Sequence, residues 1–325
     1  WVSKLSGGFA EPWTFGERVR DWILAHAQHF DVIHDNQTLA DGILDLQQAG
    51  LPVVTTIHHP ISRDLSVALA GASSWRARLL VRRWHSFLTM QARVAAQLNH
   101  IVTVSSASAA DIVTDFGVLP SAIQVIPNGV DIELFRALPD VTRKPAQLIA
   151  TASADAPLKG LAVLLQAFKL LSADRPALQL MLIASPKPGG DTEALISQLQ
   201  LGDRIHFVGG ASHADIVRLY AESTVAVVPS LYEGFGLPAV EAMASGIPLV
   251  SSDGGALAEV VGDGGLLVPA GDAKALAEAV GVVLSDADVA AELVNRGQHR
   301  AHRTFSWSVC ARLMVEQYQR CIESC

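Results

Sequence analysis

Two glutamates flank a glycine-rich turn in the second half of the chain. Glu233 precedes Gly234-Phe235-Gly236, and Glu241 follows Pro238 by three residues. Proline suits the first turn of a helix, and glycine allows the main chain to approach a ligand closely. Unpaired N–H groups at a helix start suit an anionic or hydroxyl-rich group, and carboxylates accept hydrogen bonds from hydroxyls. The pattern predicts a sugar-nucleotide site; the alternative is a solvated loop carboxylate and an exposed helix residue.

Lys159 is a candidate cation for the same site. It lies with Gly160 between an expected strand and an expected helix. Open α/β sheets bind ligands at the carboxyl ends of their strands, so this lysine is placed where a ligand is expected. Its positive charge would stabilise a departing diphosphate. The alternative is a surface lysine at the start of a helix.

A histidine is the candidate in the first half of the chain. His58 ends the apolar run Val53–Ile57, so a buried strand would carry it to the edge of a sheet. His59 is an alternative to His58, and a hydrogen bond within the loop would be the structural explanation. His34-Asp35-Asn36 ends the preceding strand in the same way and is a weaker candidate for an acceptor site.

Alternating strand-like and helical segments must position these residues. Alternation of this kind predicts parallel sheets covered by helices on both faces. The expected strands are 31–34, 52–57, 101–104, 123–126, 147–151, 178–183, 205–208, 225–228, 248–251 and 265–268, and the expected helices cover 16–29 and begin near 161, 192, 213 and 238. The turn Pro127–Asp131 separates two series of strands and favours two domains.

Composition excludes several classes of protein. A chain of 325 residues, half of them apolar and 17% charged, is long enough for two packed domains. A net charge of −8 argues against a general nucleic-acid binder. No apolar run approaches the roughly 20 residues needed to cross a bilayer. The three cysteines, all near the C-terminus, have no framework spacing, so we predict a cytoplasmic protein.

The segment EGFGLP followed by EAMASGIPLV resembles the E-x7-E signature of the family-4 retaining glycosyltransferases of GT-B fold, with Glu233 and Glu241 as its carboxylates. The resemblance implies an α/β protein with two Rossmann-like, doubly wound parallel-sheet domains facing a cleft. It implies an acceptor-side domain over 1–130, a donor-binding domain over 131–305, and a helix over 306–325 that packs back across the first. Because a helical stretch precedes the first strand, we expect the N-terminal domain to be incomplete, with its first strands missing.

The same resemblance implies roles for individual residues. Glu233 and the amides after it would hold the donor sugar, Glu241 the ribose, and a Thr-x-His segment ending at His58 the donor sugar. The predicted catalytic residues are His58, Lys159 and Glu233, and the predicted donor-binding residues are Ser153, Gly160, Val208, Phe235, Gly236, Leu237 and Glu241. The family carries an arginine six residues before its Lys-Gly pair, where this chain has Ser153. A serine brings no charge, so another cation or the helix dipole would have to compensate.

The resemblance therefore implies transfer of a sugar from a nucleotide-diphosphate donor, a UDP- or GDP-sugar, with retention and without a metal or other cofactor. The acceptor would be a glycan, a lipid-linked sugar or a small molecule. The departing diphosphate would take the acceptor proton, and the carboxylates would orient the donor. The alternatives are a weak or inactive nucleotide-sugar-binding relative and a nucleotide-sugar epimerase of similar fold.

Two further patterns bear on partners. Arg76, Arg78, Arg82 and Arg83 share a segment with tryptophan and leucine, which is typical of a helix on an anionic membrane or a helix with a solvated basic face. A peripheral position on the inner face of the membrane stays open. Asp286-Ala287-Asp288 has the spacing of a metal-binding Asp-x-Asp motif, but acidic residues at a helix start explain it better.

Overall fold

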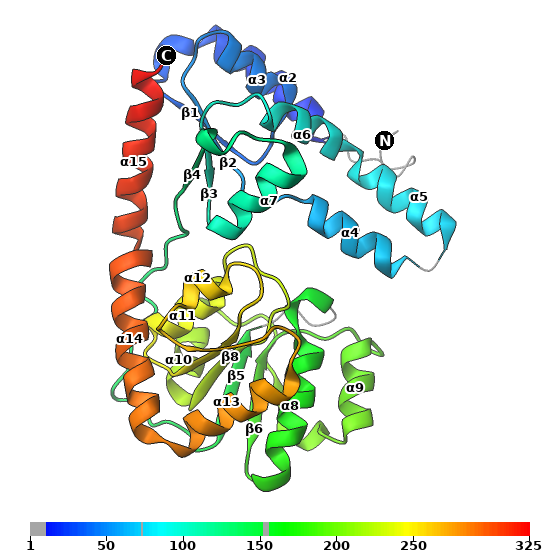
Figure 1. The fold of residues 1–325 in the computed structure, drawn as a ribbon, viewed down its shortest axis with the longest axis vertical. Helices are drawn as coiled ribbons and strands as arrows, with labels where there is room; N and C mark the ends of the chain where they lie inside the picture. The colour runs from blue at the N-terminus through cyan, green and yellow to red at the C-terminus, as the bar shows by residue number, and fades with distance from the viewer. Residues whose placement is uncertain (1–10, 73, 152–155) are drawn as a thin grey trace. The chain divides into compact units, whose positions relative to one another are not determined.

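The computed structural model describes residues 11–72, 74–151 and 156–325. The chain divides into two compact units, one made of Trp1–Ile126 with Arg312–Cys325 and the other of Pro127–Ala311. Each unit is built on its own parallel sheet (Figure 1). The predicted α/β class with two parallel-sheet domains is confirmed.

The first unit contains a four-stranded sheet in the order β1-β2-β3-β4. Every pairing in it is parallel, with Ile33 opposite Val53 and Ile101 opposite Ile123. Its strands are β1 (Ile33–Asn36), β2 (Val53–Thr56), β3 (Ile101–Thr103) and β4 (Ile123–Val125). Its helices are α2 (Glu11–Ala25), α3 (Asp41–Gln48), α4 (Ser62–Gly71), α5 (Trp75–Trp84), α6 (Leu88–Ala95) and α7 (Ser106–Phe116).

Apolar side chains cover both faces of this first sheet. One face packs on a large cluster that includes Ile43, Leu46 and Ile112. The other face, with Val54 and Val102, packs against side chains of α15 (Trp307–Glu323). Cys321 of that helix is fully buried there, so it is a packing residue.

The second unit contains a six-stranded sheet in the order β10-β9-β8-β5-β6-β7. Its strands are β5 (Gln147–Thr151), β6 (Gln179–Ile183), β7 (Ile205–Phe207), β8 (Val225–Val228), β9 (Leu249–Ser252) and β10 (Leu266–Val268). The order runs outward in both directions from β5 and β8, which is the doubly wound nucleotide-binding order with its switch point between those two strands.

Helices cover this second sheet. They are α8 (Leu161–Asp174), α9 (Asp191–Leu199), α10 (His213–Glu222), α11 (Leu237–Ala244), α12 (Leu257–Val261), α13 (Ala273–Ser285) and α14 (Ala287–Phe305). Figure 1 shows α8 and α13 side by side, and both contribute to the buried cluster with Leu148 and Val227. The Asp286 carboxylate accepts the N–H groups of Asp288 and Val289 at the start of α14. That cap confirms the helix-start interpretation of Asp286-Ala287-Asp288.

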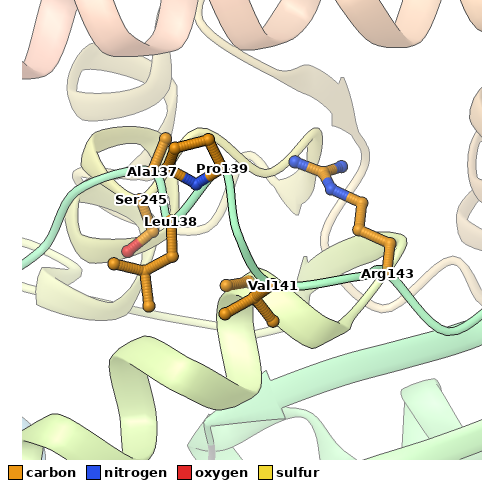
Figure 2. A pocket seen from close by; sticks show the side chains of 7 residues that line it. Ala137, Leu138, Pro139, Val141, Arg143 and Ser245 are labelled. Carbon is orange, nitrogen blue, oxygen red and sulfur yellow. The ribbon is translucent and has the colours of Figure 1, made fainter.

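A pocket of about 190 Å³ lies at the carboxyl end of α11 (Figure 2). It is lined by Ala137, Leu138, Pro139, Val141, Arg143, Ala221 and Ser245. The Arg143 guanidinium donates to the Gly246 carbonyl, and burial lowers the pKa of this arginine. None of the predicted site residues in the described part of the chain lines the pocket.

Candidate active site

Lys159 and Glu233 meet at the switch point of the second sheet. Lys159 follows β5 and Glu233 follows β8, and these strands are neighbours. The Lys159 Nζ lies 2.8 Å from the Glu233 Oε1, although the residues are 74 positions apart. The Ser230 hydroxyl donates to the same oxygen at 2.8 Å. A charged pair at this edge provides both a cation and an acceptor where such sheets bind nucleotides.

The two turns that carry this pair are in direct backbone contact. The Leu231 N–H donates to the Leu158 carbonyl at 2.8 Å. Gly160 has a φ of +64°, and a Cβ at this position would lie 1.9 Å from the Pro229 carbonyl oxygen. Only glycine fits this backbone and this approach. Gly160 is therefore required for the geometry that brings Lys159 to Glu233.

The turn between Glu233 and α11 is held from behind by the loop that follows β9. The Ala256 N–H donates to the Glu233 carbonyl at 2.9 Å, and Gly255 pairs with Glu233 in an isolated bridge. The Phe235 side chain is 4% exposed and contacts the ring of Phe305 edge to face, with centroids 5.6 Å apart. Phe235 is thus a core anchor, and it can offer a ligand only its backbone.

The start of α11 offers backbone donors. Gly236, with a φ of +98°, is the N-cap residue and makes no side-chain cap hydrogen bond. Leu237 at the first helical position is exposed, and Pro238 has no N–H to satisfy. Such a helix start attracts negative charge and hydrogen-bond acceptors.

Glu241 lies one turn into α11 in a partly buried setting. Burial raises the pKa of its carboxyl, while His213 acts in the opposite direction. Tyr220 is buried beside it; its hydroxyl donates to the Pro238 carbonyl at 3.4 Å and lies 3.3 Å from the Thr151 Oγ1. Burial raises the pKa of Tyr220, and the negative charge of Glu241 raises it by a smaller amount. Tyr220 and Ser230 support the site, and neither stands in a motif that would have singled it out.

One further predicted donor residue, Val208, is not brought to this pair. Val208 directly follows β7, on the far side of β6 from β5. Its N–H donates to Leu182 at 2.8 Å and its carbonyl accepts from Ala184 at 3.2 Å, so its backbone extends the strand pairing. Ser153 lies outside the described residues. Compensation for the missing arginine by another cation or by the helix dipole stays a prediction.

A second polar cluster lies at the carboxyl edge of the first sheet. The His58 Nε2 is 2.9 Å from the Asn36 Oδ1, and its backbone N–H donates to the Gln37 Oε1 at 2.8 Å. Burial lowers the pKa of His58, and His59 and His34 lower it further by repulsion. A neutral imidazole at this position can accept or donate a hydrogen bond to a sugar hydroxyl.

His34 and Asp35 have structural partners. The His34 ring nitrogens lie 2.7 Å from the Tyr318 hydroxyl and 2.7 Å from the Thr56 hydroxyl. The Asp35 carboxylate is buried and accepts the N–H groups of Thr38 and Leu39. Of the three residues predicted to line an acceptor site, only Asn36 directs its side chain at His58.

Comparisons with known proteins identify the family and the fold. Residues 139–300 match the family Glycosyl transferases group 1, and residues 3–134 match Glycosyltransferase Family 4. The solved structure of sucrose-phosphate synthase from Thermosynechococcus elongatus superposes with a TM-score of 0.75 at 26% identity, over 96% of this chain and 78% of that one. HepE from Anabaena, solved with UDP, has a TM-score of 0.73 at 20% identity, over 93% and 82% of the two chains, and shows the fold alone.

Fold and site together define a glycosyltransferase of GT-B fold. The MMP alpha-(1->4)-mannosyltransferase of Mycolicibacterium hassiacum is 45% identical over 325 residues, 99% of this chain and 78% of that protein. The phosphatidyl-myo-inositol mannosyltransferase of Mycolicibacterium smegmatis is 29% identical over 93% of this chain and 74% of that one. The chain belongs to glycosyltransferase family 4. The family and the glycosyl-transfer function predicted from the sequence are confirmed.

Proposed function

We propose that this glycosyltransferase moves a sugar from a nucleoside-diphosphate donor to an acceptor hydroxyl, with retention of configuration and without a metal. The observation that carries the proposal is the Lys159–Glu233 pair at the switch point, next to the uncapped start of α11. A bound diphosphate would find a cation and backbone donors there. Those groups act where negative charge develops as the bond to the sugar breaks.

Each predicted residue that the proposal uses has one role in this reaction. Lys159 and the amides near Gly160 stabilise the departing diphosphate. Glu233 and the backbone after it orient the sugar, Glu241 accepts from the ribose hydroxyls, and His58 contacts the sugar. The departing diphosphate takes the proton of the acceptor hydroxyl, which attacks the sugar on the same face. No side chain serves as nucleophile.

The relatives suggest the sugar and the acceptor. Two of them are named mannosyltransferases, one of which forms an alpha-(1->4) linkage and the other of which acts on phosphatidyl-myo-inositol. We therefore propose a mannosyl group as the transferred sugar, and a glycan in preference to a lipid-linked acceptor, because the relative named for an alpha-(1->4) linkage has the higher identity. GDP and UDP are the nucleotides to test first.

The proposal predicts an alpha-linked product from an alpha-configured donor. The full-length protein is incubated with GDP-mannose or UDP-glucose and methyl α-mannoside, and the anomer of the product is read from the one-bond coupling between C1 and H1 of the transferred sugar, because the H1–H2 coupling of mannose is small in both anomers. Addition of EDTA is expected to leave the rate unchanged, because Lys159 supplies the positive charge. A beta-linked product would contradict retention, and loss of the rate in EDTA would contradict metal independence. If no donor is consumed or bound, the protein is an inactive relative.

We also propose that α5 rests on an anionic membrane surface. Trp75 is 71% exposed, and Leu79, Leu80 and Trp84 are exposed as well. The four arginines Arg76, Arg78, Arg82 and Arg83 share the helix, whose ten residues include no acidic one. Exposed tryptophan and leucine beside arginine suit the boundary between lipid headgroups and acyl chains. Charge complementarity selects anionic lipid, because α5 carries four arginines and no acidic residue, although the chain as a whole carries −8.

Vesicle binding tests this surface. The protein is expected to sediment with phosphatidylglycerol vesicles and not with phosphatidylcholine vesicles, since each arginine near the surface contributes about 1 kcal/mol. Replacing Arg76, Arg78, Arg82 and Arg83 with serine should abolish sedimentation. If the variant with all four substitutions still sediments with phosphatidylglycerol vesicles as the wild type does, the proposal is wrong. No helix in the described part of the chain is long and apolar enough to cross a bilayer.

A further inference from the structure

The Gln37 side chain hydrogen-bonds to the backbone of two consecutive residues, His58 and His59. The Gln37 Oε1 accepts the His58 N–H at 2.8 Å, and the Gln37 Nε2 donates to the His59 carbonyl at 2.9 Å. A planar amide that makes two bonds to consecutive residues fixes both the position and the direction of that backbone. Gln37 directly follows β1, and His58 follows β2, so the contact joins the ends of two neighbouring strands.

The backbone of Gln37 is itself held in an unusual conformation. Gln37 has a φ of +62° and Leu39 a φ of +52°, a left-handed region that residues other than glycine rarely adopt. The Asp35 carboxylate accepts the N–H groups of Thr38 and Leu39 at 3.2 and 3.1 Å. Such strain persists only where several contacts impose it. The turn after β1 is therefore specified by its surroundings.

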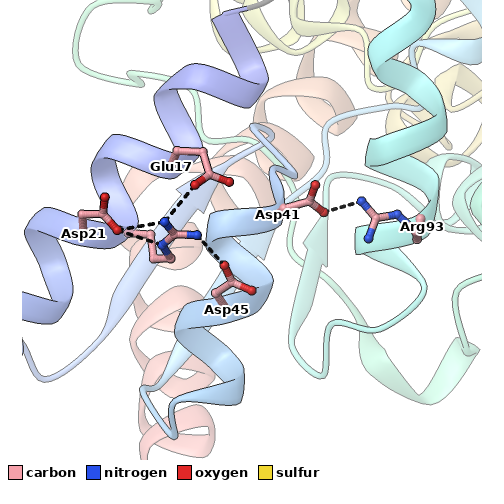
Figure 3. Close-up of polar contacts among 6 residues, drawn as sticks. Glu17, Asp21, Asp41, Asp45 and Arg93 are labelled. Atoms are coloured by element: carbon pink, nitrogen blue, oxygen red, sulfur yellow. Dashed lines mark hydrogen bonds and ion pairs between the residues drawn. The ribbon is translucent and has the colours of Figure 1, made fainter.

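Helix α6 supplies further contacts to this turn. The buried Gln91 Nε2 donates to the Gln37 carbonyl at 3.3 Å and to the Thr38 carbonyl at 3.1 Å. Two residues later on the same helix, Arg93 pairs with Asp41 at the start of α3 (Figure 3). The turn is thus held between α3 and α6, which gives the Gln37 side chain a rigid base.

We propose that Gln37 is a positioning residue that sets the imidazole of His58 for its contact with the donor sugar. The Asn36 Oδ1, 2.9 Å from the His58 Nε2, orients the ring, and Gln37 orients the backbone that carries it. The inference rests on the proposed role of His58. Fixing a group that contacts the substrate lowers the barrier by removing unproductive orientations.

The chain contains a matched control for this clamp. The Gln47 Oε1 accepts the Asn99 N–H at 2.9 Å, and the Gln47 Nε2 donates to the Gln97 carbonyl at 2.9 Å. Gln47 lies in the last turn of α3, and its partners precede β3, so this clamp lies at the amino edge of the same sheet. Gln37→Met and Gln47→Met each remove two backbone hydrogen bonds and keep the length of the side chain.

The test measures kcat for sugar transfer from GDP-mannose or UDP-glucose, whichever is turned over, and the Kd for the corresponding nucleoside diphosphate. Gln37→Met is expected to lower kcat by about tenfold to a hundredfold and to leave the Kd unchanged. Gln47→Met should leave both unchanged. Hydrogen exchange of the His58 and His59 amides should accelerate in Gln37→Met alone. Gln37→Glu, which keeps the acceptor for the His58 N–H, should lose less activity than Gln37→Met.

The other outcomes separate the two proposals. If His58→Ala loses activity while Gln37→Met matches the wild type or Gln47→Met, the positioning role of Gln37 is wrong. If His58→Ala keeps full activity, the role of His58 itself is wrong, and loss of activity in His59→Ala would transfer it to His59. If Gln37→Met does not fold, Gln37→Glu is measured in its place. The inference is then wrong if Gln37→Glu keeps the wild-type kcat although hydrogen exchange of its His58 and His59 amides is accelerated.

Discussion

Replacing Lys159 with alanine is expected to lower kcat/KM by about a hundredfold to a thousandfold, the usual effect of removing one preorganised charge-stabilising group. Lys159 lies at the switch point and contacts Glu233 at 2.8 Å. Without it, the departing diphosphate would lose the proposed cation, and among the described residues the Glu233 Oε1 would keep the hydrogen bond from the Ser230 hydroxyl. Steady-state kinetics with GDP-mannose or UDP-glucose gives the ratio.

A matched variant separates this effect from the loss of an ion pair. Lys144 pairs with Glu222 at 2.6 Å in the same unit, and like Lys159 it has a carboxylate partner that is mostly buried. Lys144→Ala should leave kcat/KM unchanged, and Lys159→Arg should retain part of it. Wild-type activity in Lys159→Ala would remove Lys159 from the mechanism.

Replacing Glu241 with glutamine is expected to weaken nucleoside-diphosphate binding by about tenfold to a hundredfold, because a hydrogen bond to a charged group contributes about 1.5 to 3 kcal/mol. The same change should stabilise the unliganded protein at neutral pH. Burial raises the pKa of Glu241 in the folded state, so the unfolded state releases this proton first. Wild-type stability therefore falls as pH rises above the unfolded pKa and stops falling above the folded one.

Two measurements check these opposite effects. Calorimetry with GDP and UDP gives the binding constants, and urea midpoints from acidic to neutral pH give the stability. Wild type and Glu241→Gln should converge in acid and diverge as pH rises. Glu222→Gln is the control with the opposite sign, because hydrogen bonding from Lys144 lowers the pKa of Glu222. It should cost stability above the unfolded pKa and leave binding unchanged; equal binding in Glu241→Gln would contradict the ribose role.

Local pattern predicted the elements of the fold well. Each strand range expected from the sequence appears as a strand, and β5 and β8 have the expected bounds. The helix expected over 16–29 is found at Glu11–Ala25, and among the strands the largest difference is at β1, expected over 31–34 and found at Ile33–Asn36. Asp35 and Asn36 are typical of a loop, but pairing with Thr55 and Thr56 continues the strand through them. Tertiary context therefore overrides propensity at a strand end.

Roles inside the site were harder to predict. Motif position predicted that the backbone of Phe235 faces the ligand, which stays a prediction, but it did not predict that the Phe235 side chain is buried against Phe305. Val208 was predicted as a donor residue, and the structure places it beyond β6 with its backbone committed to strand pairing. Gln37 and Tyr220 were missed, because a glutamine after a strand and a tyrosine in a helix carry no local signal of what they contact.

The sequence by itself determined the succession of strands and helices, the two-domain organisation and the family, because periodicity, turn residues and the motif around Glu233 and Glu241 are local in the chain. Only the tertiary structure decided which strands are neighbours. The order that places β5 beside β8 brings Lys159 to Glu233 across 74 positions, and the pairing of β1 with β2 brings Gln37 to His58. Such contacts arise from nonlocal packing of buried faces, which local patterns do not encode.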